Sequence, residues 1–167
     1  IQEAIPHMRR VAEENPNAQV LVRAIAFSSG AKWHISEPTD IEDFEWLSLE
    51  ARGVTDMGKA CELLKEELQI PPMSDRALPP VLVLISDGQP TDDYKESLNA
   101  LLKMPWGTKA VRLAIAIGKS ASTKVLKEFI NNDEIEPILA ENAKELVEYI
   151  KWVSTVVLQA EIGRAHV

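Results

Sequence analysis

A short apolar run that ends in an acidic turn constrains the fold of this chain more than any other feature. The run Pro80–Ile85 is rich in Val, Leu and Ile, and Ser86, Asp87 and Gly88 follow it directly. It is too short to cross a membrane, and its composition is typical of a strand buried on both faces of a parallel sheet. Asp87 is then expected at the carboxyl edge of that strand, where open α/β sheets bind ligands.

Strand and helix patterns alternate along the rest of the chain, as in a βαβ architecture. A hairpin-length loop, Ser28–Gly30, separates the first two expected strands, so they should pair antiparallel and place the second strand at a sheet edge. We therefore predict an α/β fold with a doubly wound, mostly parallel sheet, helices on both faces and one antiparallel edge strand. The expected helices cover residues 1–14, 57–69, 94–103, 123–131 and 143–158, and the expected strands cover 18–27, 31–35, 81–86, 111–117 and 137–140, with a short strand or turn around 44–49.

Composition excludes several classes of function. The net charge of −8 argues against nucleic-acid backbones and anionic membranes as partners. The single cysteine, Cys61, rules out an intrachain disulfide and a Cys-rich zinc site, and its apolar helical surroundings predict a buried, inert thiol. There is no apolar stretch of membrane-spanning length and no signal peptide, so a cytoplasmic location is expected. Of the four tryptophans, Trp106 is the one for which exposure is expected.

Both ends of the chain have an unusual sequence. An amphipathic pattern is already under way at Ile1 without an N-cap residue, which indicates a helix entered part-way. The last seven residues, Glu161–Val167, match the translation of a widely used sequencing adapter, with a natural disordered tail as the alternative. We expect one domain over residues 1–160, truncated at its N-terminus, followed by a non-native tail at 161–167.

A second polar signature, Thr55–Gly58, precedes the expected helix at 57–69 and is expected to face the same sheet edge as Asp87. A Thr hydroxyl and an Asp carboxylate are hard oxygen ligands that suit Mg²⁺. Other roles remain open, because Thr55 also suits a helix N-cap and Asp56 suits the first turn of a helix. Capping of the following helix is the favoured role for the three residues Thr91, Asp92 and Asp93.

The acidic element Ser86–Asp93, the loop Thr55–Gly58 and the βα alternation together resemble the von Willebrand factor A (VWA) domain, a Rossmann-like fold. The closest resemblance is to its bacterial, tellurite-resistance-type branch, in which a segment similar to Lys151–Ser154 lies in the last helix. The resemblance covers roughly residues 1–158. It implies a non-enzymatic, cytoplasmic, bacterial module that recruits a protein through a metal-bridged acidic residue, with partners in signalling or stress responses.

The resemblance also implies a metal-ion-dependent adhesion site made of three loops, which hold Mg²⁺ or Mn²⁺. Thr55 matches the second loop and Asp87 the third, and Gln89 is expected on the rim that meets the partner. The first loop, Asp-x-Ser-x-Ser, occurs nowhere in this sequence and is expected just upstream of Ile1. With two of the three loops, the chain should bind the metal weakly or not at all.

The strand that would carry the first loop is a central one in the family, between the strands at 18–27 and 81–86. Without it, these two strands should either close up or leave an open slot with two apolar edges.

The rival hypothesis is a metal-dependent, phosphatase-like hydrolase that uses Asp87 as ligand or nucleophile and Asp92 or Asp93 as a helper. Such chemistry usually needs a cationic group for the phosphate. The nearest one in sequence, Lys95, lies within the helix pattern that follows. The hydrolase is therefore the less favoured hypothesis.

Overall fold

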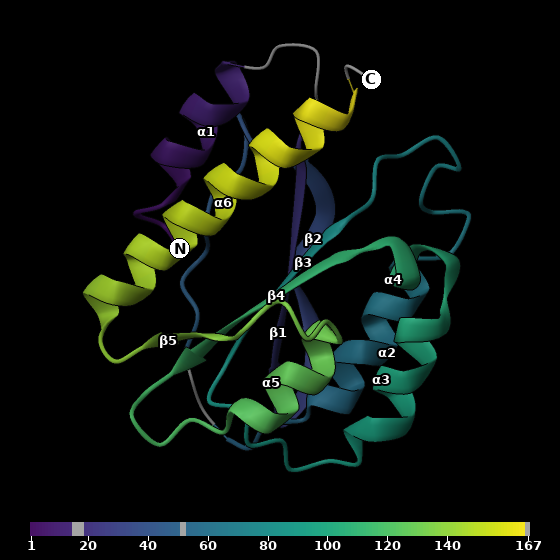
Figure 1. Ribbon diagram of the computed structural model, residues 1–167, viewed down its shortest axis with the longest axis vertical. Coiled ribbons are helices and arrows are strands. Elements are labelled where there is room, and N and C mark those ends of the chain that lie inside the picture. The colour runs from purple at the N-terminus through teal and green to yellow at the C-terminus, as the bar shows by residue number, and fades with distance from the viewer. Residues whose placement is uncertain (15–18, 51–52, 166–167) are drawn as a thin grey trace.

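The computed structural model describes residues 1–14, 19–50 and 53–165, with side chains described up to residue 153 and at residue 155 (Figure 1). Helices and strands alternate along the chain, as the sequence predicts. In chain order they are α1 (Ile5–Glu13), β1 (Leu21–Ser28), β2 (Gly30–Asp40), α2 (Met57–Glu67), β3 (Val81–Ser86), α3 (Tyr94–Lys103), α4 (Pro105–Lys109), β4 (Val111–Ile117), α5 (Thr123–Ile130), β5 (Ile138–Ala140) and α6 (Ala143–Ala165).

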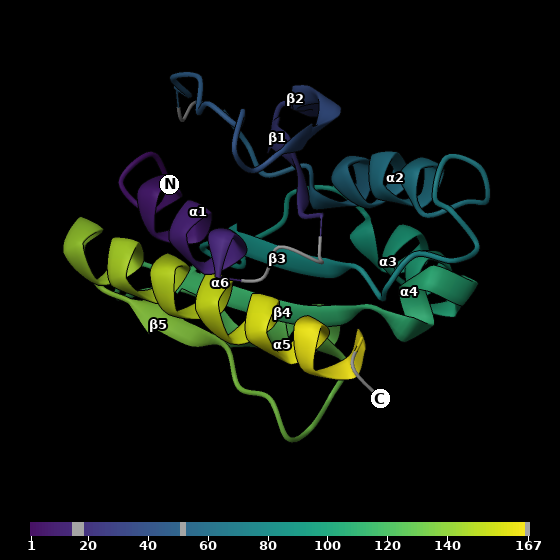
Figure 2. The same cartoon turned by 90° about the horizontal axis from the view of Figure 1, so that it is seen from above.

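The strands form two sheets. β1 and β2 pair antiparallel, and β3, β4 and β5 form a parallel sheet in that order. Figure 2 shows the β1–β2 hairpin apart from the parallel sheet. The predicted α/β class with an antiparallel edge strand is confirmed. Two arrangements were expected for β1 and β3, closed up or apart, and in the structure they are apart.

Helices cover both faces of the parallel sheet, and β4 shows this residue by residue. Ala114 and Ala116 pack in a core with α2, α3 and α5, whereas Ile115 packs in a second core with Ala4, the N-cap residue of α1, and with α6. All three residues are at most 1% exposed. Successive side chains of a strand point to opposite faces, so the two cores lie on opposite sides of the sheet.

The hairpin is held beside the parallel sheet by helices rather than by strand pairing. Ile5 of α1 packs in a third core with Ile35 of β2 and the buried Phe44. The Arg9 guanidinium of α1 donates to the carbonyl oxygens of Ile41 and Phe44 at 3.1 and 2.8 Å. On the other side, α2 contacts both hairpin strands.

Several elements differ from the sequence prediction. β2 continues to Asp40 instead of ending at residue 35, because a register shift lets this edge strand accommodate Pro38. Residues 44–49 form no strand, and the short helix α4 was not predicted. The turn expected at 15–17 lies outside the described residues.

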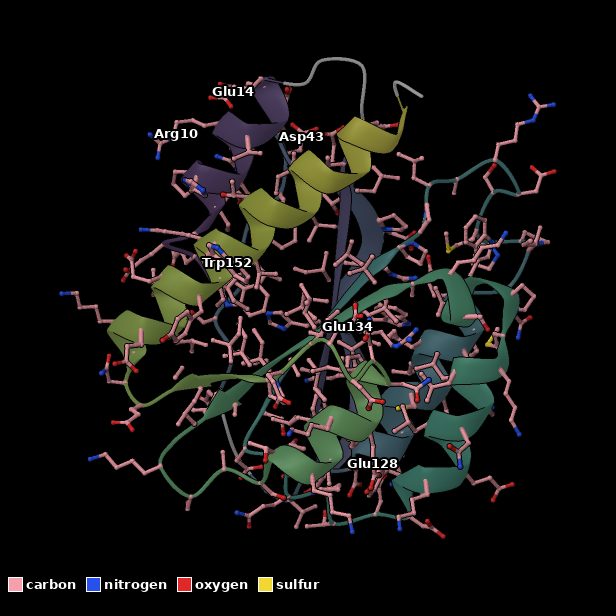
Figure 3. The ribbon with its side chains drawn as sticks, in the orientation of Figure 1. Arg10, Glu14, Asp43, Glu128, Glu134 and Trp152 are labelled. Carbon is pink, nitrogen blue, oxygen red and sulfur yellow. The ribbon has the colours of Figure 1, made fainter. Side chains whose placement is uncertain are left out.

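The expected exposure of Trp106 is wrong. Pro105 starts α4, and Trp106 is turned into the core with α2, α3 and α5, where it is 4% exposed. The exposed tryptophan is instead Trp152 of α6, at 54% (Figure 3). Within the described part of the chain, no helix combines the length and apolarity needed to cross a bilayer.

Candidate functional site

The candidate site lies where the loop after β3 meets the loop before α2. Both threonines of these loops take part in a reciprocal contact. The Thr91 backbone N–H donates to the Thr55 carbonyl oxygen at 2.9 Å, and the Thr55 N–H donates to Thr91 Oγ1 at 2.9 Å. The structure therefore brings the two loops that carry Thr55 and Asp87 into direct contact, as the sequence predicts from their position at one sheet edge.

Asp92 joins the same two loops through a helix cap. Its carboxylate accepts the backbone N–H groups of Gly58 and Lys59 at 3.0 and 3.1 Å, so it caps the N-terminus of α2. A Cβ added at Gly58 would lie 2.8 Å from Asp92 Oδ2, so the approach of this carboxylate requires glycine. The prediction that Asp92 caps the following helix is wrong, because its side chain bonds to the preceding helix.

Asp56 connects the loop before α2 to the turn of the β1–β2 hairpin. Its carboxylate accepts the Gly30 N–H at 2.7 Å and the Thr91 hydroxyl at 3.3 Å, and it pairs with the Lys59 ammonium at 3.2 Å. The Gly30 hydrogen bond, followed by the contact with Lys59, lowers the pKa of Asp56. Asp56 is the N-cap residue of α2 rather than a residue of its first turn, and its oxygens are engaged within the protein.

Asp87 and Gln89 form an exposed edge on the other side of the site. Asp87 Oδ1 accepts the Gln89 N–H at 3.1 Å, and the Asp87 carbonyl accepts the Ser122 N–H at 2.8 Å. Gln89 Nε2 donates to the Ser120 carbonyl at 3.1 Å, so the loop after β4 supports this edge. Both residues are exposed to solvent.

The close packing of these loops depends on Gly88. Its φ of +70° lies in the left-handed region, and a Cβ at this position would lie 2.0 Å from the Ser122 carbonyl oxygen. Glycine therefore lets the Asp87 loop lie against the start of α5.

Comparison by sequence finds no match: neither a family model nor a curated protein is similar to this chain. Comparison by structure finds 41 similar chains. A von Willebrand factor type A protein from Catenulispora acidiphila has a TM-score of 0.63 at 13% identity, with 91% of this chain and 37% of that chain covered. The chain has the fold of a VWA domain.

Two further structural neighbours are informative. Proximal thread matrix protein 1 from the mussel byssus, with zinc in its metal-ion-dependent adhesion site (MIDAS) motif, has a TM-score of 0.66 at 16% identity over 94% of this chain and 40% of that chain. BatB from Bacteroides thetaiotaomicron has a TM-score of 0.59 at 12% identity over 94% of this chain and 87% of that chain. The chain thus spans less than half the length of the Catenulispora and mussel proteins.

The oxygen ligands that this chain offers are of the type that suits the metal of a VWA site, but there are too few of them. The Thr55 hydroxyl and the Asp87 carboxylate are hard oxygens on adjacent loops. Asp56 and Asp92 are committed to backbone N–H groups, and the described residues contain no group of three or more acidic, His or Cys side chains that could hold a metal ion. Mg²⁺ can complete its octahedral shell with water, but a single carboxylate and a neutral hydroxyl supply too little charge to hold it tightly, so these two residues alone do not form a complete metal site.

Sequence reasoning missed the two residues that join the loops, Thr91 and Asp92. Their role depends on the distance between loops that are 36 residues apart in the chain, a distance that no local pattern encodes. One signal was present: Gly58 at the start of a helix indicates that another group approaches the backbone there.

Proposed function

We propose that this chain is a non-enzymatic protein-interaction module of the VWA type, and that a partner protein binds the edge formed by Thr55, Asp87 and Gln89. The reciprocal hydrogen bonds between Thr55 and Thr91 carry this proposal. They hold two loops together as one surface, while the side chains of Asp87 and Gln89 stay exposed. A surface that is fixed by backbone contacts and presents exposed polar side chains suits the recognition of a partner.

Thr55 and Asp87 are, in this proposal, two of the oxygen ligands of a Mg²⁺ or Mn²⁺ ion. The other ligands would come from a segment or partner outside this chain, since the described acids at Asp56 and Asp92 are engaged elsewhere. The same proposal includes the partners that the resemblance suggests, which are bacterial cytoplasmic proteins of signalling or stress responses. It also includes membership of the tellurite-resistance-type branch.

Calorimetric titration of the chain with Mg²⁺ and with Mn²⁺ tests the metal part. We expect no binding in the micromolar range, because two ligands supply too little charge and too few bonds. Micromolar affinity that disappears in Asp87→Ala and persists in Asp93→Ala would show instead that the chain holds a complete site. Asp93 is a suitable control because it is an exposed acid of the same loop.

The interaction part is tested by affinity capture of bacterial proteins on the immobilised protein, with and without Mg²⁺. A partner whose capture requires Mg²⁺ should be lost in Asp87→Ala and weakened in Gln89→Ala, and should be retained in Asp93→Ala. Equal capture by all variants would place the interface away from this edge.

The hydrolase alternative gains no support from the geometry. Asp92, one of its two helper acids, caps α2 with its carboxylate. Lys95, the nearest cation in sequence, is an exposed residue of α3. We expect no phosphatase activity that Asp87→Ala abolishes, in an assay with p-nitrophenyl phosphate and added Mg²⁺.

A further inference from the structure

A groove lies along one edge of the β1–β2 hairpin. It has a volume of about 270 Å³ and is lined by residues of β2 between His34 and Thr39 and by residues of the following segment between Asp43 and Leu47. No described residue of β1 lines it, so it lies on the side of β2 that has no partner strand among the described residues. Figure 2 shows the hairpin and the segment after it on the outside of the molecule. We call this feature the β2 groove.

Hydrogen bonds and ring packing fix the two walls of the β2 groove relative to each other. His34 Nε2 donates to the Leu47 carbonyl oxygen at 2.8 Å, and the centroid of its ring lies 4.7 Å from that of the Trp46 ring. From α1, the Arg9 guanidinium donates to the Phe44 carbonyl oxygen at 2.8 Å. The groove is therefore formed without a ligand, which lowers the entropic cost of binding one.

The backbone of β2 does not suit the addition of a further strand. Its pairing with β1 has register shifts on both sides of Ile35, and Pro38 has no N–H to donate. Bulges and prolines are among the features by which edge strands avoid pairing with other chains. Recognition at this edge therefore depends on the side chains of the groove rather than on a backbone ladder.

The lining of the β2 groove combines an apolar base with an acidic rim. Ile35 and Phe44 are 9% and 2% exposed, whereas Glu37, Asp43 and Glu45 are exposed. None of these three acids forms an ion pair with another residue in the described part of the chain, and no described lysine or arginine lines the groove. The three negative charges are thus left for a ligand of opposite charge.

An organic cation suits these acids better than a metal ion. The described residues contain no group of three acidic, His or Cys side chains that could hold a metal ion, so the three acids line one groove without converging on one point. The volume of the groove is also below the range of about 300–1,000 Å³ that is typical of small-molecule sites. A single long basic side chain fits both limits, because its aliphatic part can cover Ile35 and Phe44 while its charged end reaches the carboxylates.

We propose that the β2 groove binds an arginine side chain that a segment of a partner protein presents. Guanidinium suits several carboxylates at once, since it donates in a planar fork. Leu47, which is 59% exposed in the groove lining, is covered by an apolar neighbour of that arginine. A second copy of this chain is a poorer occupant, because two chains of net charge −8 repel each other. The inference goes beyond the proposed function, since the groove shares no residue with the edge formed by Thr55, Asp87 and Gln89.

A capped peptide with the sequence Gly-Leu-Arg-Arg-Leu-Gly is the probe, and nuclear magnetic resonance of the ¹⁵N-labelled chain measures its binding. The peptide should shift the amide signals of residues 34–39 and 43–47, with little change in residues 111–117 of β4. Replacement of both arginines by citrulline, which is neutral and similar in size, should weaken binding by at least about tenfold. Absence of binding at millimolar peptide, or shifts confined to other residues, would overturn the proposal.

A matched pair of double variants separates the groove from general attraction to an acidic protein. Asp43→Asn with Glu45→Gln removes two charges from the groove and should weaken peptide binding by about tenfold. Asp133→Asn with Glu134→Gln removes the same number of charges from the exposed loop before β5 and should change the affinity by less than about twofold. Figure 3 shows Asp43 and Glu134 in different parts of the molecule. Equal weakening by the two double variants would overturn the assignment to the groove.

A pair of leucine variants tests the apolar part of the contact. Leu47→Ser should weaken peptide binding by about fivefold, because it removes apolar area that the peptide covers. Leu49→Ser is the matched control and should leave binding unchanged, since Leu49 is also exposed, at 48%, but does not line the groove. Equal effects of the two variants would contradict the contact with Leu47.

Two further measurements identify the occupant. Spermidine carries positive charge without an arginine or an apolar side chain, and it should bind at least about tenfold more weakly than the peptide. Equal affinity for spermidine would overturn the assignment to a protein segment. A dimer in light scattering whose formation competes with the peptide would show that a second copy of the chain is the occupant, against the proposal.

Discussion

At the scale of single residues, the candidate site is held by carboxylates that bond to backbone N–H groups of other loops. Asp92 is the clearest case, because it satisfies two N–H groups at the start of α2 from a different loop. We expect Asp92→Ala to lower the free energy of unfolding by about 1–2 kcal/mol, the usual cost of losing a helix cap. Urea denaturation measures this difference.

Asp93→Ala serves as the matched control for Asp92→Ala. Asp93 is the N-cap residue of α3, yet its side chain makes no capping hydrogen bond and is exposed. Its replacement should change the free energy of unfolding by no more than about 0.5 kcal/mol. Equal losses for the two variants would mean that the cap across the loops contributes little.

The stability contributed by Asp56 should depend on pH. The Gly30 N–H and the Lys59 ammonium lower the pKa of this carboxyl below its ordinary value of 3.8. Such a group contributes stability above the pKa of the unfolded chain, and the contribution is lost as the pH falls through the lower pKa of the folded state. The difference in unfolding free energy between wild type and Asp56→Asn should therefore be constant above about pH 5 and shrink below 3.8. Denaturation at several pH values checks this, and a difference independent of pH would contradict it.

At the scale of elements, the connection between β3 and α3 depends on the backbone of one glycine. Gly88→Ala should cost more than about 2 kcal/mol, because it combines a left-handed φ with a clash against the Ser122 carbonyl. Gly118→Ala separates the two causes, since Gly118 has a φ of +88° and nothing within 4 Å of an added Cβ. We expect about 1 kcal/mol for Gly118→Ala in thermal or urea unfolding. A Gly88→Ala cost equal to that of Gly118→Ala would remove the steric argument.

The elements that carry strong periodicity were predictable from sequence, and those set by proline or by tertiary contact were not. The apolar run at 81–86 predicted β3 correctly, and the buried Cys61 was expected from its helical pattern. α4 was missed because its five residues are too few to show a helical period. The same limit applies to the site: the sheet edge brought the Thr55 and Asp87 loops together as expected, whereas the Asp92 cap depends on packing between loops.

At the scale of the whole molecule, the hairpin and the parallel sheet share helices, and the hairpin has a hydrophobic core of its own, although Phe27 of β1 also packs against the core of the parallel sheet. Phe44 lies in the core between α1 and the hairpin, and Phe129 lies in the core between the parallel sheet and α2, α3 and α5. The hairpin has no strand pairing with the parallel sheet in the described residues. This arrangement favours local opening of the hairpin at a lower free energy than unfolding of the sheet.

Native-state hydrogen exchange of two phenylalanine variants tests whether the cores are energetically separate. Phe44→Ala removes a side chain that is 2% exposed and should speed exchange in β1 and β2 with little effect on β4. Phe129→Ala, from a site that is 5% exposed, should speed exchange in β4. Each variant is expected to cost about 3–5 kcal/mol in its own core. If Phe44→Ala accelerated β4 as much as β1, the hairpin and sheet would unfold as one unit, even though β1 and β3 are apart in the structure.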